Sequence, residues 1–287
     1  MRKLDNFSFL IVLSLAALNA LVWFRITFYD KGGETQFFFL DVGQGDGMLG
    51  IFEGGAKFLV DAGPGAKTVS SLQEVLDSGD KYIDFALITH PQLDHFGGFN
   101  SILEKYNVGA FIINGREVKL PEWAELMDKI KKRKIPLVTL GVNDKIIYRE
   151  NTIDFLSPDN RQIQSAELND SSLVNLVRTP DVKVLLTGDI GENIEKYLME
   201  KFKAENLQAD ILKVPHHGSK YSSSEDFLEI VKPKIAVIEV GKNNYGHPTQ
   251  EVLDRLEKSS IQTFRTDILN TLSFRFARGK VLVFSLK

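Results

Sequence analysis

The stretch ITHPQLDHFGGF, residues 88–99, places His90, Asp94 and His95 on one short loop after an apolar run. Imidazole nitrogens and carboxylate oxygens are ligands that suit zinc, manganese or iron. The residue between His90 and Asp94 that would most usefully be another ligand is Gln92, whose neutral amide oxygen binds such ions more weakly. The stretch predicts a metal centre and leaves open whether its ligand set is complete.

The remaining histidines and two aspartates also follow apolar runs. They are His216 and His217 in VPHHGS, His247 in NNYGHPT, Asp61 in LVDAG and Asp189 in LLTGD. Each alone is weak, because a lone histidine is more often a surface residue and Asp-Gly after a strand is usually a turn. Together they indicate one shared site, because open α/β sheets collect their sites at the carboxyl ends of strands.

Apolar strands and amphipathic helices alternate along the chain. Runs such as KFLVDAG and IDFALITH predict strands, and LPEWAELMDKIKKRK and IGENIEKYLMEKF predict helices. The alternation predicts an α/β fold in which helices flank the sheets. With 287 residues, 43% of them hydrophobic, the chain can bury the core of one layered domain.

The first residues differ from the rest. An apolar run over residues 7–24 follows Arg2 and Lys3, and as a helix it would extend ~27 Å, close to the ~30 Å hydrocarbon core of a membrane. We predict an anchor and linker over residues 1–34, membrane contact through residues 7–28, and a folded domain over residues 35–287. The early basic residues favour a single-pass protein of the cell membrane with this domain outside the cytoplasm. The alternative is a cleaved signal peptide and a secreted protein.

Charge and cysteine content restrict the possible partners. The formal net charge is −3, from 35 basic and 38 acidic residues, so contact with a polyanion would need a local basic patch or a metal. Cysteine is absent, which excludes thiolate zinc sites and disulfides.

Seven motifs stand in one order from about Phe37 to the C-terminus: FLDVGQGDGMLG, LVDAG, THPQLDHFGG, NDSSLV, LLTGD, LKVPHHGS and VGKNNYGHP. In these motifs the chain resembles the metallo-β-lactamase fold superfamily. Within it, the chain is most similar to the soluble metallohydrolase domain of the ComEC-like competence proteins, which take up DNA. The resemblance implies a four-layer αββα sandwich, here preceded by one N-terminal transmembrane helix, with a metal site at one edge of the two sheets. With one predicted span, DNA transport itself is not expected.

The resemblance also implies a ligand set for one or two divalent ions, zinc or manganese. In the superfamily pattern His-x-His-x-Asp-His, the two leading histidines bind one ion and the Asp-His pair binds the second. The implied metal ligands are His90, Asp94, His95, Asp189, His216 and His247, with Asp189 bridging the ions. One or more of the three late histidines would complete the set, and the sequence does not assign which bind metal and which contact substrate.

Five further residues are expected to support this site: Asp61, Gln92, Asn169, Asp41 and Asp46. Asp61 would accept a hydrogen bond from a ligand imidazole. The two aspartates of DVGQGD, Asp41 and Asp46, would shape the same edge, although a structural turn role is equally open. Gln92 and Asn169 offer only amide oxygens, so we expect an intact second site and a weakened first site.

The ligand pattern and the apolar N-terminal run predict a membrane-anchored, metal-dependent hydrolase, and the resemblance implies that it is a phosphodiesterase or nuclease. A bound divalent ion lowers the pKa of its water towards about 7 and neutralises charge on a phosphoryl oxygen. We expect Asp94, His217 and His247 to be catalytic, with a late histidine protonating the leaving oxygen. The expected partner is a phosphodiester, with DNA as one candidate, and no protein partner is inferable.

Two alternatives remain open from the sequence. One is an envelope phosphoesterase of the phosphorylcholine esterase type, and the other is a non-catalytic metal-binding module with a degenerate first site. A basic groove formed by Lys213, Lys220 and Lys242 would favour nucleic acid. An aromatic cage near Tyr221 or Tyr245 would favour choline.

Overall fold

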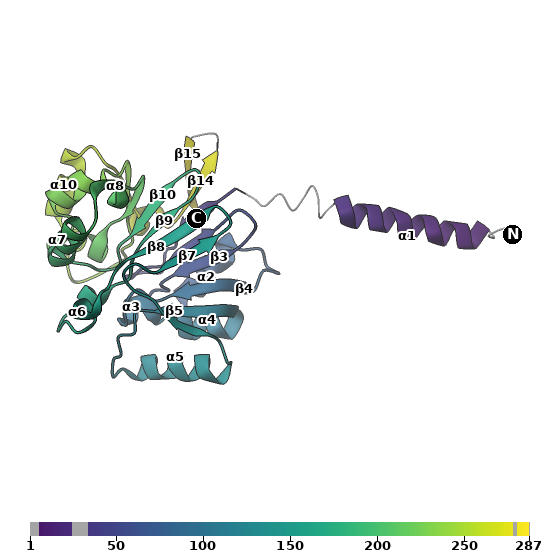
Figure 1. Cartoon of the computed structure of the whole chain (residues 1–287), viewed down its shortest axis with the longest axis horizontal. Helices are drawn as coiled ribbons and strands as arrows, with labels where there is room; N and C mark the ends of the chain where they lie inside the picture. The colour runs from purple at the N-terminus through teal and green to yellow at the C-terminus, as the bar shows by residue number, and fades with distance from the viewer. Residues whose placement is uncertain (1–5, 25–33, 278–279, 287) are drawn as a thin grey trace.

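The computed structural model describes residues 6–24, 34–277 and 280–286. Two sheets make up the folded domain (Figure 1). The first has the order β15-β14-β1-β2-β3-β4-β5-β6. Its strands are β1 (Gln36–Phe39), β2 (Met48–Ile51), β3 (Lys57–Val60), β4 (Tyr82–Leu87), β5 (Asn107–Ile113), β6 (Leu137–Thr139), β14 (Thr271–Ala277) and β15 (Lys280–Leu286).

The second sheet has the order β13-β12-β11-β10-β9-β8-β7. Its strands are β7 (Lys145–Tyr148), β8 (Asn151–Ser157), β9 (Val174–Arg178), β10 (Lys183–Leu186), β11 (Ile211–Lys213), β12 (Ile235–Ile238) and β13 (Gln262–Arg265).

Helices cover the outer face of each sheet. The described helices are α1 (Asn6–Phe24), α2 (Lys67–Val75), α3 (Leu93–Phe96), α4 (Phe99–Lys105), α5 (Pro121–Lys132), α6 (Asn160–Ile163), α7 (Glu192–Lys201), α8 (Ala204–Leu207), α9 (Glu225–Val231), α10 (Gln250–Lys258) and α11 (Thr266–Leu269), with short 3₁₀ turns η2 (Asn169–Ser171) and η3 (Pro215–Gly218). The helices α2, α4 and α5 pack on the first sheet, and α7, α9 and α10 pack on the second.

Three buried apolar layers hold these parts together. The middle layer lies between the sheets, and one outer layer lies under each set of helices. Strand β1 shows why, because successive side chains of a strand point to opposite faces. Phe37 and Phe39 enter the middle layer, whereas Phe38 enters the layer under α2, α4 and α5. The predicted four-layer αββα sandwich is confirmed.

The parallel strands bring the polar motifs to one edge. Strand β3 pairs in parallel with β4, and β10, β11 and β12 form a second parallel set. The segments with Asp61, His90, Asp189 and His217 follow β3, β4, β10 and β11. Because parallel strands end at the same side of a sheet, these four segments emerge together.

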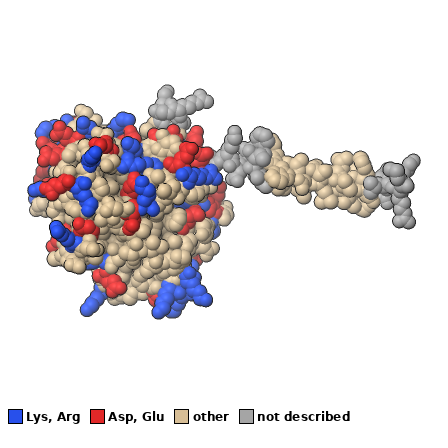
Figure 2. Space-filling model, viewed as in Figure 1, with Lys and Arg blue, Asp and Glu red and all other residues tan. Residues whose placement is uncertain are grey.

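The N-terminal helix α1 is long and apolar enough to cross a membrane. Its residues Phe7–Phe24 have a mean hydropathy of 2.2, and none of that window is buried against the domain. Figure 2 shows α1 without charged side chains. The predicted apolar helix is confirmed in these terms. The expected membrane contact of residues 25–28 lies outside the described residues, and the domain boundary at residue 34 stays a prediction.

Candidate metal centre

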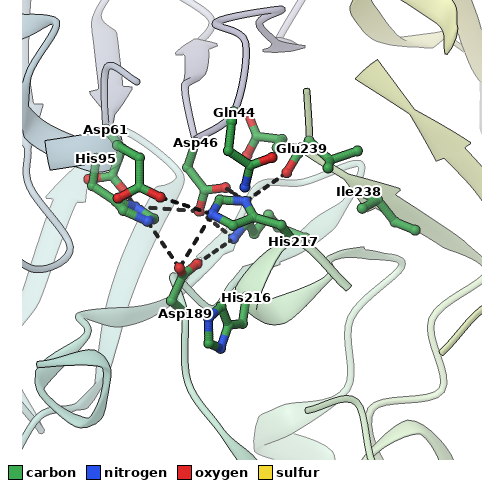
Figure 3. A network of polar contacts seen from close by, with 12 residues as sticks. Gln44, Asp46, Asp61, His95, Asp189, His216, His217, Ile238 and Glu239 are labelled. Atoms are coloured by element: carbon green, nitrogen blue, oxygen red, sulfur yellow. Dashed lines mark hydrogen bonds and ion pairs between the residues drawn. The ribbon is translucent and has the colours of Figure 1, made fainter. Parts of the chain in front are cut away.

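Four side chains converge at the common edge of the two sheets. Asp94, His95, Asp189 and His217 each offer one ligand atom, and these atoms all lie within 4.8 Å of one another. His95 Nε2 is 3.2 Å from Asp189 Oδ2. His217 Nε2 is 3.4 Å from that same oxygen and 3.4 Å from Asp94 Oδ2. Figure 3 shows both imidazoles directed at Asp189.

This four-residue group fits a divalent ion. The Nε2 atoms of His95 and His217 are buried and face the carboxylates of Asp189 and Asp94 at 3.2–3.4 Å. If each imidazole is neutral with its proton on Nδ1, these Nε2 lone pairs face carboxylate oxygens, and a bound ion would remove that unfavourable contact. Two imidazole nitrogens and two carboxylate oxygens suit zinc or manganese, and an ion with five or more ligands would keep a position for water.

The opposite nitrogen of each imidazole is held from behind. His95 Nδ1 lies 2.8 Å from Asp61 Oδ2, and His217 Nδ1 lies 2.8 Å from the carbonyl oxygen of Glu239. Both contacts favour the tautomer that carries its proton on Nδ1, so that Nε2 is free to bind metal. Asp61 is fixed in turn by the amide and hydroxyl of Thr89, at 2.8 and 2.7 Å. The structure therefore places Asp61 where it orients His95.

The two adjacent histidines of VPHHGS lie in a left-handed turn that points their side chains in different directions. His216, His217 and Gly218 have φ angles of 50°, 52° and 82°. Such angles are uncommon for residues with a side chain and persist only where the surroundings enforce them. The turn directs His217 into the four-residue group, while His216 faces the cleft beside it.

A buried lysine lies behind the ligands. Lys213 is 2% exposed, pairs with the carboxylate of Asp46, and lies 3.5 Å from Asp189 Oδ1. It also donates a 2.8 Å hydrogen bond to the carbonyl of Gly188. Asp46 Oδ1 is 3.3 Å from His217 Nδ1. Lys213 therefore compensates buried carboxylates and is not available for the basic groove that would have favoured nucleic acid.

Glu239 is a second charged-type residue in this interior. Its Oε1 accepts a 2.9 Å hydrogen bond from the amide of Gly47, and its side chain is almost fully buried. Burial, reinforced by the charge of Asp46, raises the pKa of Glu239 to about 8. Glu239 is thus mostly protonated at neutral pH and adds little negative charge to the site.

The carboxylates and imidazoles change one another's protonation. Burial alone would raise the pKa of Asp189, but the charges of His217, His95 and Lys213 hold it well below its usual value. Burial alone would lower the pKa of His95, but Asp189 and Asp61 raise it well above its usual value. The pKa of His217 is raised in the same way by Asp189 and Asp46. A metal ion must therefore displace protons from both imidazoles.

His90 lies beside the four-residue group but outside it. Its ring centroid is 4.1 Å from that of His95, and its buried Nε2 has no described partner. Burial lowers the pKa of His90 to about 3, so the imidazole is neutral. Its Nδ1 lies 3.0 Å from the hydroxyl of Thr89.

The two amide residues expected at the weakened first site contact each other and lie beside two of the late histidines. Gln92 Nε2 donates a 2.6 Å hydrogen bond to Asn169 Oδ1, and Asn169 Nδ2 lies 3.4 Å from His216 Nε2. The ring of His247 packs at 79° to that of His216, with centroids 5.5 Å apart. The structure therefore places Gln92, Asn169, His216 and His247 together, outside the four-residue group.

An open cleft of about 470 Å³ exposes the centre. Its lining consists of Gln44, Pro64, Gln92, Leu93, Asp94, Asn169, Asp189, His216, His217, Tyr245 and His247. Asp41 is not in this lining. It instead accepts hydrogen bonds from the amide of Gly43, at 3.2 Å, and from Lys67 Nζ, at 2.5 Å. These contacts favour the turn role for Asp41.

Sequence reasoning did not assign Lys213 and Glu239 to this site. A signal was present, because each is a charged residue at the carboxyl end of an apolar run, in ILKVP and IAVIEVG. A charged residue in such a run is buried and needs compensation. Two runs of this kind ending at one sheet edge indicate a paired interior site.

Comparisons with known proteins agree with this geometry. Residues 47–241 match the family model described as the Metallo-beta-lactamase superfamily. The chain is 31% identical over 266 residues to ComE operon protein 3 of Bacillus subtilis (strain 168), covering 86% of this chain and 34% of that protein. It is 29% identical over 245 residues to Competence protein ComA of Neisseria gonorrhoeae, covering 84% and 32%. The chain thus spans about a third of the length of these curated relatives.

The fold is also similar to that of solved structures. One is described as a new diphosphatase from the PhnP family, with a TM-score of 0.51 and 14% sequence identity. The similarity covers 88% of this chain and 100% of that one. At this identity the likeness is one of fold.

We expect metal affinity to fall as the pH is lowered. The raised pKa values of His95 and His217 keep both imidazoles protonated in the metal-free protein at neutral pH, so binding one ion releases about two protons. Titration calorimetry in two buffers of different ionisation enthalpy measures this release. The variant His247→Gln is the control and should release as many protons. Binding without net proton release would contradict the ligand assignment.

We expect Lys213→Met to lower the free energy of unfolding of the metal-free protein by about 3–5 kcal/mol, because it leaves buried carboxylates without their cation. Chemical denaturation measures the change. Lys220→Met, at an exposed lysine, is the matched control and should change stability by less than about 0.5 kcal/mol. Equal effects of the two substitutions would show that Lys213 does not compensate buried charge.

Proposed function

Because the chain belongs to the metallo-β-lactamase superfamily, as its ordered motifs predicted, we propose that it is a metal-dependent phosphodiesterase that cleaves nucleic acid. The observation that carries the proposal is the four-residue metal-binding group at the base of an open cleft. Asp94, Asp189 and His217 belong both to this group and to the cleft lining, so a substrate in the cleft would meet the ion directly.

The ion would activate a water molecule, and the residues around it would orient that water. When bound, zinc or manganese would lower the pKa of a water towards about 7 and neutralise charge on a phosphoryl oxygen. Asp94 faces the cleft, with 31% of its side chain exposed. Burial raises the pKa of Asp94, but His95 and His217 outweigh it and lower the pKa to about 2. The ionised carboxylate can therefore accept a hydrogen bond from the attacking water and orient it.

The leaving oxygen needs a hydrogen-bond donor, and His247 is a candidate in the cleft wall. It is half-buried there, and its Nδ1 has no hydrogen-bond partner among the described residues. Burial and the neighbouring His216 lower the pKa of His247, so at neutral pH its neutral N–H would hydrogen-bond the leaving oxygen while solvent water supplies the proton. His217, our other candidate, is directed at the four-residue group instead.

Tyr245 favours a nucleic acid over a choline ester. Its side chain is 76% exposed at the cleft, and its ring lies at 30° to that of His247 with centroids 5.9 Å apart. A nucleobase can stack on such a ring. Tyr221 is not in the described lining of the cleft, so the two tyrosines do not form the cage that binds quaternary ammonium. The relative named as a competence protein supports a nucleic-acid substrate.

We propose in addition that α1 anchors the protein in the cell membrane with the domain outside the cytoplasm, where it would act on DNA during uptake. The apolar helix and the competence relatives support this location. The face drawn in Figure 2 mixes basic and acidic side chains and has no basic stripe. On that face, surface charge would not attract DNA.

We expect manganese- or zinc-dependent hydrolysis of bis-p-nitrophenyl phosphate, reduced at least about 100-fold by Asp189→Ala, because Asp189 is the carboxylate that both imidazoles approach. Initial rates and metal content are measured together. Asp128→Ala, an exposed helix residue, is the control and should match the wild type. A chain that binds metal but turns over no phosphodiester would favour the non-catalytic module.

We expect Tyr245→Ala to reduce kcat/KM for a single-stranded oligonucleotide about 5- to 100-fold, the loss expected for one stacked base. Turnover of methyl p-nitrophenyl phosphate, which has no nucleobase, should change less than about twofold. Tyr245→Phe should retain the preference, and Tyr221→Ala serves as the exposed-tyrosine control. An equal reduction of kcat/KM for both substrates would show that Tyr245 does not stack on a nucleobase.

A further inference from the structure

The cleft wall beside His90 is where a second ion of a two-metal centre would be expected. This wall consists of Gln92, Asn169 and His216, which we call the amide–imidazole group. All three side chains are half-buried and line the cleft next to Asp189. Their hydrogen bonds run from Gln92 to Asn169, at 2.6 Å, and from Asn169 to His216, at 3.4 Å.

The residues at this wall do not fit a second ion. A zinc site takes about four ligands, and its nitrogen ligands are neutral imidazoles beside charged carboxylates or thiolates. Here His90 and His216 each offer an imidazole nitrogen and Asp189 offers a shared carboxylate, but His216 Nε2 already lies 3.4 Å from the Nδ2 donor of Asn169. Gln92 and Asn169 add only neutral amides, and these are already bonded to each other. Among the described residues, the wall contributes no carboxylate of its own to such a site.

The bridging carboxylate is also committed on both oxygens. Asp189 Oδ2 lies 3.2 and 3.4 Å from the Nε2 atoms of His95 and His217. Asp189 Oδ1 faces the other way, 3.5 Å from the buried ammonium of Lys213. Lys213 thus acts as a positioning residue that turns a single oxygen of Asp189 towards the metal-binding group.

We infer that this chain binds one divalent ion, on Asp94, His95, Asp189 and His217, and that the amide–imidazole group replaces the second ion by hydrogen-bonding a non-bridging phosphoryl oxygen of the substrate. The number of ions follows from the ligand geometry alone. The assignment of the wall to a phosphoryl oxygen rests on the proposed function.

The hydrogen-bonding capacity of the wall supports this role. Each primary amide carries two N–H donors. Gln92 uses one of them on Asn169, and Asn169 directs one at His216. One N–H of each amide therefore remains for a ligand in the cleft. Two amide donors side by side suit an anionic oxygen, and hydrogen bonds to a charged acceptor are about twice as strong as those between neutral groups.

The test is a metal titration of the full-length chain in detergent, stripped with a chelator and then loaded with manganese or zinc. We expect about one ion per chain for the wild type and for Gln92→Leu, with affinities that agree within about threefold. Gln92→Leu should raise KM for bis-p-nitrophenyl phosphate about 10-fold, the loss expected for one hydrogen bond to a charged group. Two ions in the wild type, or the loss of an ion in Gln92→Leu, would overturn the inference.

A gain-of-site variant gives the converse test. Gln92→His combined with Asn169→His places two imidazoles beside His90, and we expect it to bind about two ions. If this variant does not fold, Gln92→Asp, which adds one carboxylate, is expected to show a second, weaker ion. Folded variants that still bind one ion would show that ligand identity does not exclude the second ion.

The measurements separate this inference from the proposed function. One ion per chain without any phosphodiester turnover would refute the proposed function and leave the single-ion centre standing. Two ions per chain with turnover would refute the single-ion centre alone. One ion and an unchanged KM in Gln92→Leu would refute the phosphoryl-binding role of the wall.

Discussion

Buried negative charge is the constraint on which the site depends. The carboxylates of Asp46, Asp61 and Asp189 lie within the protein, and each is at most 3% exposed. Isolated buried charges are too costly to persist, so they must be compensated by cations or hydrogen bonds. The buried Lys213 ammonium and the imidazole of His95 supply part of this compensation. A metal ion can compensate the remaining negative charge. Metal binding and the stability of this edge therefore depend on the same buried carboxylates.

The fold meets this constraint by bringing loops from both sheets into close contact. Asp94 and His95 come from the first sheet, and Asp189 and His217 come from the second. The Asp46 loop closes over them because Gly45 has no side chain. A Cβ at Gly45, whose φ is +142°, would lie 2.1 Å from the carbonyl oxygen of Asp94. Only glycine tolerates both that approach and that angle.

Much of this arrangement was predictable from strand ends. The alternation of elements indicated the layers, and aspartates and histidines after apolar runs indicated a shared edge. The sequence could not distinguish the roles of two adjacent histidines in one turn. His216 and His217 have the same chemistry, and a left-handed backbone that no sequence pattern reveals decides which one faces the ligands. Glu239 was missed, and Lys213 was considered only for a surface groove, because a charged residue at the end of an apolar strand was not expected to be buried. Their burial depends on partners over 160 residues away, Asp46 and Gly47.

The central claim is that one ion binds on four residues and that a neutral wall stands where a second ion would be. The most direct measurement is anomalous diffraction from crystals soaked with zinc or manganese. The account predicts one peak, about 2.0–2.2 Å from ligand atoms of Asp94, His95, Asp189 and His217. A second peak of similar height between His90, Gln92 and Asp189 would contradict it, as would a single peak at that second position.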